Sequence, residues 1–185
     1  MASNDTTPLP SPDASACSQL SAFEILSTCH EHILERLAVL EQVGNELQKS
    51  EQIEDGHLAR LGELLAFLDT VIPIHSADEE VSLFPRLRKL GPFVGAEHTP
   101  MDCMESEHVG HGEQKAQLKV AMAKRDAAKA GRCAMTMVRD YRTHIRKEED
   151  ILYPMARELL TDADVIATMT EEMRGRRVKA GLMGC

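Results

Sequence analysis

Aromatic residues are scarce in this sequence: they make up 3% of its 185 residues, with no tryptophan, two tyrosines and four phenylalanines. Sheets are usually built from aromatic and β-branched residues, whereas the abundant Ala, Leu, Met and Glu of this chain favour helices. Nucleic-acid binding needs a cationic face and often aromatic stacking platforms, and the net charge here is -9. We therefore expect an all-α protein that binds no nucleic acid.

Paired cysteines and long apolar runs are also missing. The five cysteines include no CxxC motif, so neither a disulfide framework nor a zinc ribbon is indicated. No apolar stretch reaches the roughly 18 residues that cross a membrane, and the first residues lack the basic start and apolar run of a signal peptide. We expect a cytoplasmic protein with reduced thiols and no membrane contact.

The length favours a single domain with tails, because 185 residues can bury a core without disulfide or metal staples. Residues 1–18 are rich in Pro and Ser and are expected to form a disordered N-terminal tail. Residues 161–185 are expected to hold a short helix, capped by Asp162 or Thr161, and a second tail. The basic cluster RGRRVK at 174–179 is interpreted as a solvated helix end.

Four stretches carry apolar residues at the three-four spacing of an amphipathic helix. They are predicted at residues 19–49, 54–89, 100–130 and 132–160. Turn signals separate them, with Gly131 between the last two, and Pro73 is expected to kink or break the second helix one turn before His75. The pattern predicts an antiparallel up-down-up-down four-helix bundle over residues 19–160.

Two of these helices contain the same spacing of residues. The strings HSADEEVSLFP, at 75–85, and HIRKEEDILYP, at 144–154, share six positions. These are a His, a Glu at plus four and plus five, a Leu at plus eight, an aromatic residue at plus nine and a Pro at plus ten. A His and a Glu four residues apart lie on one helix face, and the Pro is expected to end or kink the helix beyond the Glu.

Polar residues interrupt the buried stripe of every helix at one height in the bundle. The interruptions are His30, His75, Glu79, His108, His144 and Glu148. Counted from the expected helix ends, they lie about 12 to 18 Å from the same end of the bundle. Carboxylates buried at one level repel each other unless a cation binds them. The sequence therefore predicts a metal site inside the bundle.

The donor set indicates which metals would bind. Imidazoles and carboxylates without cysteine suit iron, manganese or zinc rather than copper(I) or an iron–sulfur cluster. Two carboxylates suggest two ions, whose roughly twelve octahedral positions would be filled by imidazoles, bridging carboxylates and a shared oxo or hydroxo bridge, with about two left open. Open positions predict reactivity with small molecules. Glu80 and Glu149, at plus five, are expected at the surface or beside the ligands rather than among them.

The four stretches resemble the helices of the hemerythrin-like, HHE cation-binding domain family. The resemblance covers residues 20–160 and rests on CHEHILERLAVLEQV, IPIHSADEEVSLFPRL, ESEHVGHGE and YRTHIRKEEDILYPMA. It implies a non-haem di-iron site in an antiparallel four-helix bundle. The ligands that it implies are His30, His75, Glu79, His108, His144 and Glu148, with the two glutamates bridging the two iron ions.

The sequence departs from the oxygen-carrying hemerythrins on the third helix. Those proteins have a second histidine four residues after the first, and Gly112 occupies that position here. His111 is interpreted as a fifth ligand, as a proton-donating neighbour of the ligands, or as a solvent-exposed residue. Gly110 and Gly112 either leave room for a small ligand or mark only a poorly ordered helix start. One imidazole fewer favours a sensor or redox-active site over a reversible oxygen carrier.

Three classes of function follow from this interpretation, and the oligomeric state stays open. The first is a di-iron protein that binds or senses dioxygen, or a related small oxidant such as nitric oxide or peroxide. The second is a redox enzyme that reduces peroxide or nitric oxide or oxidises iron. The third is a regulatory or iron-supply protein whose fold depends on metal.

Overall fold

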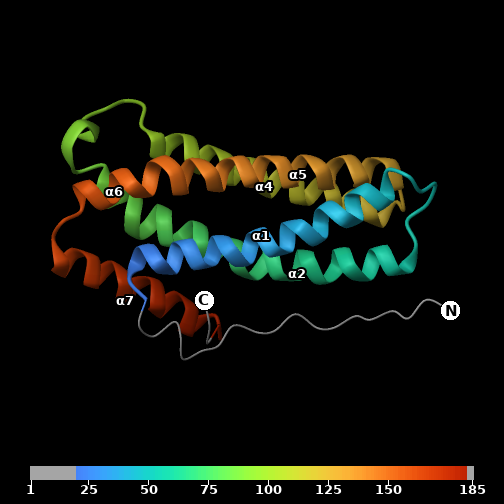
Figure 1. The fold of residues 1–185 in the computed structure, drawn as a ribbon, viewed down its shortest axis with the longest axis horizontal. Coiled ribbons are helices and arrows are strands. Elements are labelled where there is room, and N and C mark those ends of the chain that lie inside the picture. The colour runs from blue at the N-terminus through green and yellow to red at the C-terminus, as the bar shows by residue number, and fades with distance from the viewer. Residues whose placement is uncertain (1–19, 183–185) are drawn as a thin grey trace.

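The computed structural model describes residues 20–182, which form helices and no β-strand (Figure 1). The long helices are α1 (Ala22–Leu47), α2 (Asp55–Ala77), α4 (Pro100–Ala123) and α5 (Ala127–Lys147). The expected tail at 1–18, with Cys17, and the last cysteine, Cys185, lie outside the described residues. Within the described part of the chain, no helix is long and apolar enough to cross a membrane. The all-α prediction is confirmed.

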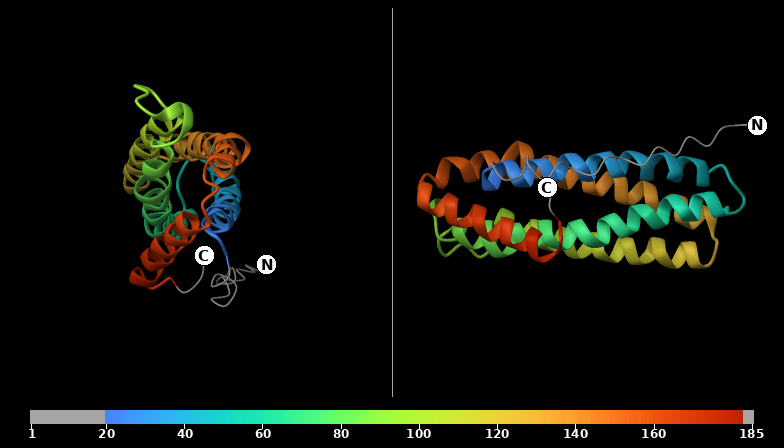
Figure 2. Two further views of the ribbon diagram at one scale, coloured as in Figure 1. Left: turned by 90° about the vertical axis from the view of Figure 1, so that its left-hand side faces the viewer. Right: turned by 90° about the horizontal axis from the view of Figure 1, so that it is seen from below.

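Two of the long helices continue through a π-helical turn into a shorter helix. After α2 come η2 (Asp78–Leu83) and α3 (Phe84–Leu87), and after α5 come η4 (Glu148–Leu152) and α6 (Tyr153–Leu159). A loop with one 3-10 turn, η3 (Gly91–Phe93), then leads to α4. Helix α1 packs against α2 and α5, and α4 packs against α5 and α2. Four rods, each a long helix together with any turn and short helix that continue it, therefore surround one core (Figure 2). This confirms the antiparallel four-helix bundle.

The core consists of two hydrophobic clusters that follow each other along the bundle axis. On α1, Leu26 belongs to one cluster and Ile33 to the other, with His30 between them. On the rod formed by α5, η4 and α6, Ile145 and Leu152 belong to different clusters, with Glu148 between them. Each fully buried aliphatic side chain stabilises the fold by about 1.5–3 kcal/mol. The polar layer therefore lies between two apolar parts of the core.

Helices α1 and α5 approach each other closely at two glycines. A Cβ atom on Gly131 would lie 3.2 Å from both the carbonyl oxygen of Gly44 and the backbone nitrogen of Gln48. The prediction of a turn at Gly131 is wrong. The turn comes earlier, at Arg125 with a φ of 51°, and Asp126 caps α5. Gly131 is needed for the helix contact and not for a change of chain direction.

Pro73 does not break the second helix, so the break, one of the two predicted effects, is wrong. Helix α2 runs without interruption to Ala77, and Pro73 lies on its exposed side. The carbonyl that a proline leaves without a partner is the one four residues earlier, here that of Asp69, which is also exposed. Water can satisfy that carbonyl, so the helix continues.

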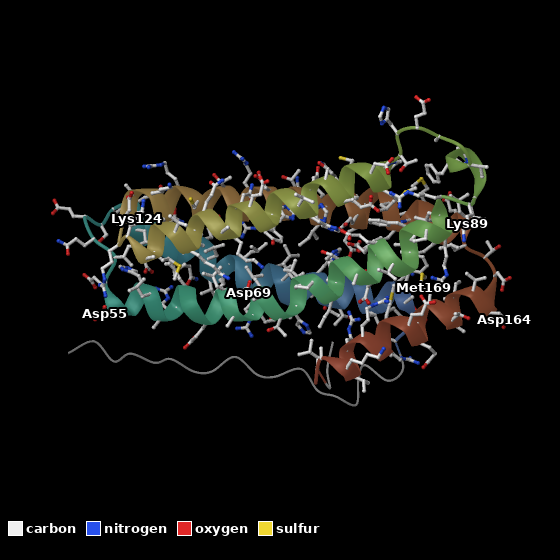
Figure 3. The ribbon with its side chains drawn as sticks, turned by 180° about the vertical axis from the view of Figure 1, so that it is seen from behind. Asp55, Asp69, Lys89, Lys124, Asp164 and Met169 are labelled. Atoms are coloured by element: carbon white, nitrogen blue, oxygen red, sulfur yellow. The ribbon has the colours of Figure 1, made fainter. Side chains whose placement is uncertain are left out.

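A further helix, α7 (Ala163–Lys179), packs along the outside of the bundle (Figure 3). Asp162 caps it by accepting a hydrogen bond from the amide of Asp164 at 2.9 Å, which confirms one of the two predicted caps. Met169 lies on the side of α7 that faces the bundle and is fully buried. The interpretation of residues 174–179 as a solvated helix end is wrong for Arg177, which is buried because it pairs with a carboxylate of η2.

Candidate metal centre

The six residues predicted as ligands converge inside the bundle. Their donor atoms form two groups, and within each group these atoms lie within 4.8 Å of one another. One group is Glu79, His108, His144 and Glu148, and the other is His30, His75 and Glu148. The four rods therefore deliver these side chains to one level, as counting along the helices predicted. Glu148 is common to both groups.

The repeated strings build the two π-helical turns. The amide of Phe84 donates to the carbonyl of Glu79, five residues earlier, and the amide of Tyr153 donates in the same way to the carbonyl of Glu148. The next residue in each string is a proline, which has no N–H and crowds the carbonyl four residues earlier. A π-helical turn accommodates both features, so the rods widen locally rather than ending at the prolines.

The histidine that starts each string faces a histidine of the preceding rod. The Nε2 atoms of His75 and His30 are 3.0 Å apart, and those of His144 and His108 are also 3.0 Å apart. All four rings are largely withdrawn from solvent. The site therefore contains two histidine pairs, one on each side of the carboxylates.

The glutamates at plus five hold histidines of the neighbouring rods. Glu80 accepts a hydrogen bond from Nδ1 of His108 at 2.7 Å, and Glu149 accepts one from Nδ1 of His30 at 2.6 Å. A carboxylate on one ring nitrogen fixes the tautomer and orientation of the imidazole. These contacts agree with the expectation that both glutamates lie beside the ligands.

Sequence reasoning missed two side chains that contact the predicted ligands. Glu107 accepts a hydrogen bond from Nδ1 of His144 at 2.9 Å and another from the ammonium of Lys147. The buried hydroxyl of Tyr153 donates to Oε1 of Glu79 at 2.7 Å. The only signal in the sequence was that the aromatic residue at plus nine is Tyr in one string and Phe in the other.

The hydrogen bonds at Nδ1 determine whether a histidine pair requires a cation at its Nε2 atoms. In the His108–His144 pair both Nδ1 atoms donate to carboxylates, so both neutral rings present a lone pair at Nε2. Two lone pairs facing each other across 3.0 Å repel. A cation must lie between or beside them, and it can be either a proton or a metal ion.

Buried atoms without a hydrogen-bond partner indicate which cation, a proton or a metal ion, fits the site. His75 Nδ1, Glu79 Oε2 and both carboxylate oxygens of Glu148 are buried without a hydrogen-bond partner. The Glu148 oxygens lie 3.1 and 3.0 Å from Nε2 of His30 and His144, without hydrogen-bond geometry. A proton on each histidine pair leaves these oxygens unsatisfied, whereas metal ions bind oxygen and nitrogen donors together. The residues present therefore fit bound metal ions.

The two glutamates differ in their pKa values. Burial and the charge of Glu148 raise the pKa of Glu79 to about 7. Burial also opposes the ionisation of Glu148, but His144 and His30 lower its pKa well below the usual range. Burial opposes the protonation of His30 and His108, but the carboxylates beside them raise both pKa values to about 9. Protons therefore occupy these histidines in the metal-free protein, and bound metal must displace them.

His111 lies next to the predicted ligands and not among them. Its ring stacks on Tyr141, with centroids 3.9 Å apart, and meets the ring of His144 edge-on at 4.9 Å. It belongs to neither group of metal donors, which favours a neighbour of the ligands over a fifth ligand. The interpretation as a solvent-exposed residue is wrong, because His111 is 5% exposed.

A small cavity borders the histidines. It measures about 10 Å³ and is lined by all four predicted histidine ligands and by Ile33, Ile72 and Ile145. Such a volume holds about one water-sized molecule. His111 separates this cavity from a groove of about 360 Å³ on the outer face between α4 and α5, because it lines both. Gly110 lies in the same groove and well inside α4, so it does not mark a helix start.

Comparison with known proteins agrees with this site. Residues 21–156 match the family model described as the hemerythrin HHE cation binding domain. An uncharacterized protein of Haemophilus influenzae (strain Rd) is 27% identical over 159 residues, which cover 84% of this chain and 89% of that protein. No solved structure gives a significant match. The match spans most of the chain and contains every side chain that converges at the centre, so the protein is a metal-binding member of the hemerythrin HHE cation-binding domain family.

Proposed function

We propose that the centre holds two non-haem iron ions. Each histidine pair would bind one ion and both glutamates would bridge the two: His30 with His75, His108 with His144, and Glu79 with Glu148. Support comes from Glu148, which is shared by two groups of donor atoms. A carboxylate shared in this way serves two ions at once, whereas a single ion would leave one histidine pair unused.

We infer that the protein binds or senses dioxygen or a related small oxidant, such as nitric oxide or peroxide. The observation that carries this inference is the cavity of about 10 Å³ against the four histidines. Its size admits only a ligand of about the size of one water molecule, and the isoleucines in its lining favour an uncharged one. Ferrous ions held at this position would supply the electrons that such a ligand accepts.

The protein's own residues prepare the site for this ligand. Glu80, Glu149 and Glu107 each hold one histidine ring through its Nδ1 atom. The isoleucines keep bulk water away from the cavity, and the hydroxyl of Tyr153 holds Glu79 in place. Side chains fixed in this way need little rearrangement when metal and ligand bind.

A redox enzyme is the second candidate, and Tyr153 favours it. Its ring stacks on His30, with centroids 5.5 Å apart and an interplanar angle of 4°, while its O–H group points at Glu79. The reduction of peroxide or nitric oxide consumes protons, and this hydroxyl donates a hydrogen bond to a predicted ligand, while burial raises its pKa above the usual range.

Metal stoichiometry and the visible spectrum test the proposal. The protein would be loaded anaerobically with ferrous iron, freed of excess metal and then exposed to air or to nitric oxide. We expect about two irons per chain and near-ultraviolet charge-transfer bands after oxidation. A spectrum of the bound form that persists indicates binding or sensing, and its immediate decay with turnover indicates the enzyme. One ion per chain, or none, would contradict the two-iron site.

A further inference from the structure

Helix α7 lies beyond the residues that match the family, yet it contacts the segment that carries Glu79. The family match ends at residue 156, and α7 begins at Ala163. Two arginines near the end of α7 reach into η2, and both bind the same carboxylate, that of Asp78. This carboxylate is adjacent in sequence to Glu79, whose side chain faces the metal centre.

Asp78 depends on α7 for its charge balance. Its side chain is 0% exposed. Nε of Arg176 donates to Oδ1 at 2.6 Å, and Nη1 of Arg177 donates to Oδ2. A buried carboxylate without a cationic partner costs several kcal/mol, and the two arginines compensate the charge of Asp78.

The second string has no carboxylate at the corresponding position. Its residue at the position of Asp78 is Lys147, which is 40% exposed and pairs with Glu107 on α4. The arginine contacts are therefore not a requirement of the repeated string. They are a separate feature of η2 and α7.

We propose that Arg176 and Arg177 are positioning residues of the metal centre. They hold Asp78, and through the π-helical turn that contains both residues they hold the carboxylate of Glu79 in the orientation that binds metal. The docked α7 thereby sets metal affinity on the Glu79 side. This inference rests on the proposed two-metal site, and Co²⁺ is a suitable probe because its visible bands report the ligand geometry.

The test uses the full chain with Arg176→Gln/Arg177→Gln, and with Asp78→Asn as an isosteric second variant. Thr170→Val is the matched control, because Thr170 also docks α7, by accepting a hydrogen bond from the amide of Ala22 at 3.0 Å. We expect all three to lower the melting temperature of the metal-free protein. Only the first two should lower Co²⁺ affinity, by about tenfold or more, and shift the visible bands.

The outcomes separate this inference from the proposed function. If the wild type binds two Co²⁺ ions and the arginine variant matches Thr170→Val in affinity and spectrum, the positioning role is wrong while the metal site stands. If the wild type binds no Co²⁺, the two-metal site itself fails. If the double variant does not fold, the single change Arg177→Lys decides: it keeps the charge, so we expect a folded protein with shifted bands, and unshifted bands would overturn the proposal.

Discussion

The strings at 75–85 and 144–154 have the same backbone but different neighbours. Both contain a π-helical turn closed by the amide at plus nine. Yet Nδ1 of His144 is held by Glu107, whereas Nδ1 of His75 is buried without a partner. The hydroxyl at plus nine is present only in the second string, in Tyr153. The spacing and the π-helical turn that the strings share determine where the side chains lie. The neighbouring helices determine which hydrogen bonds each side chain makes.

The two glutamates at plus four show the same contrast. Glu148 lies near histidines of both pairs and has a pKa well below the usual range. Glu79 accepts the Tyr153 hydroxyl and has a pKa of about 7, raised first by burial and then by the charge of Glu148. Equivalent positions in a repeat therefore give one carboxylate whose ionisation is favoured by the histidines beside it and one whose ionisation is opposed by burial and by the neighbouring carboxylate.

Replacing the glutamate at plus four of each string in turn should give the largest difference between the two strings. Glu148→Ala takes a donor from both groups, so we expect metal content to fall from about two ions per chain to nearly none. Glu79→Ala removes the other proposed bridge but takes a donor from only one of the two groups, so we expect a smaller loss, with about one ion per chain retained. Metal analysis after gel filtration measures both. His32→Ala is the control and should keep its metal, because His32 lies on the same helix as His30 but outside both groups. Equal losses of metal in the two glutamate variants would contradict the inference that Glu148 serves both groups and Glu79 only one.

Metal affinity should rise with pH. His30 and His108 have pKa values near 9 in the metal-free protein, so below that pH each ion displaces one proton. We expect affinity to increase about tenfold per pH unit for each ion between pH 7 and 8.5. Titrations with Co²⁺ in buffers that do not bind metal would measure the slope. A flat profile would mean that the histidines are already neutral.

The stability of the metal-free protein should change in the opposite direction. The pKa of His30 and His108 is raised from 6.5 in the unfolded chain to about 9 in the folded one. Their contribution to the free energy of unfolding is complete below pH 6.5 and is lost as the pH rises through 9. Thermal melts of the metal-free protein should therefore show a falling melting temperature from pH 7 to 9. A melting temperature that rises over this range would contradict the assignment.

Glu107→Gln should make the second string more like the first. The variant weakens the hydrogen bond that orients His144, and carboxylates in this position typically contribute 10–100-fold to metal affinity. We expect a loss of about tenfold, measured by competition with a chelator. Glu105→Gln is the matched control, because Glu105 lies on the same helix and pairs only with Arg88 at the surface. A loss of the same size in the control would point to a general effect of charge.

Tyr153→Phe removes the other difference between the strings. Glu79 then loses a hydrogen bond to a charged group, a contact that contributes about 1.5–3 kcal/mol when buried. We expect metal to remain bound, with affinity lowered about tenfold and the absorption bands of the oxidised iron form shifted. The spectrum is the sharper readout, because a purely structural role for Tyr153 would leave it unchanged.

His111→Leu should have the smallest effect on metal. His111 is outside both donor groups, so metal content and the spectrum of the loaded protein should stay as in the wild type. Because its ring separates the outer groove from the cavity, we expect the rate of nitric oxide binding to change, as measured by stopped-flow mixing. A loss of one ion per chain would instead identify His111 as a ligand.

The fold and the positions of the predicted ligands were accessible from the sequence for a physical reason. A polar residue such as His30 in the middle of an apolar stripe is conspicuous, and its height along the helix can be counted. Contacts between helices cannot be counted in this way. Glu107 contacts His144 and Tyr153 contacts Glu79 because of the way the helices pack, and beyond the Tyr–Phe difference at plus nine the local sequence gives no signal of these contacts.

The errors arose from residues whose usual role differs from their role here. The prediction of a turn at Gly131 is wrong because a glycine at a close helix contact looks the same in a sequence as a glycine in a turn. The prediction that Arg177 is solvated is wrong because its buried partner, Asp78, is 99 residues away in the sequence. For both residues the tertiary packing determines the role, and it overrides the preference of the local sequence.

The unpaired atoms of His75, Glu79 and Glu148 connect the protein's lifetime to its metal supply. A metal that binds only the folded chain stabilises it by about 4 kcal/mol when its free concentration is a thousand times the dissociation constant. Degradation in cells acts on the unfolded fraction, which such a change lowers about a thousandfold. We therefore expect the amount of this protein to follow the availability of its metal even at a constant rate of synthesis.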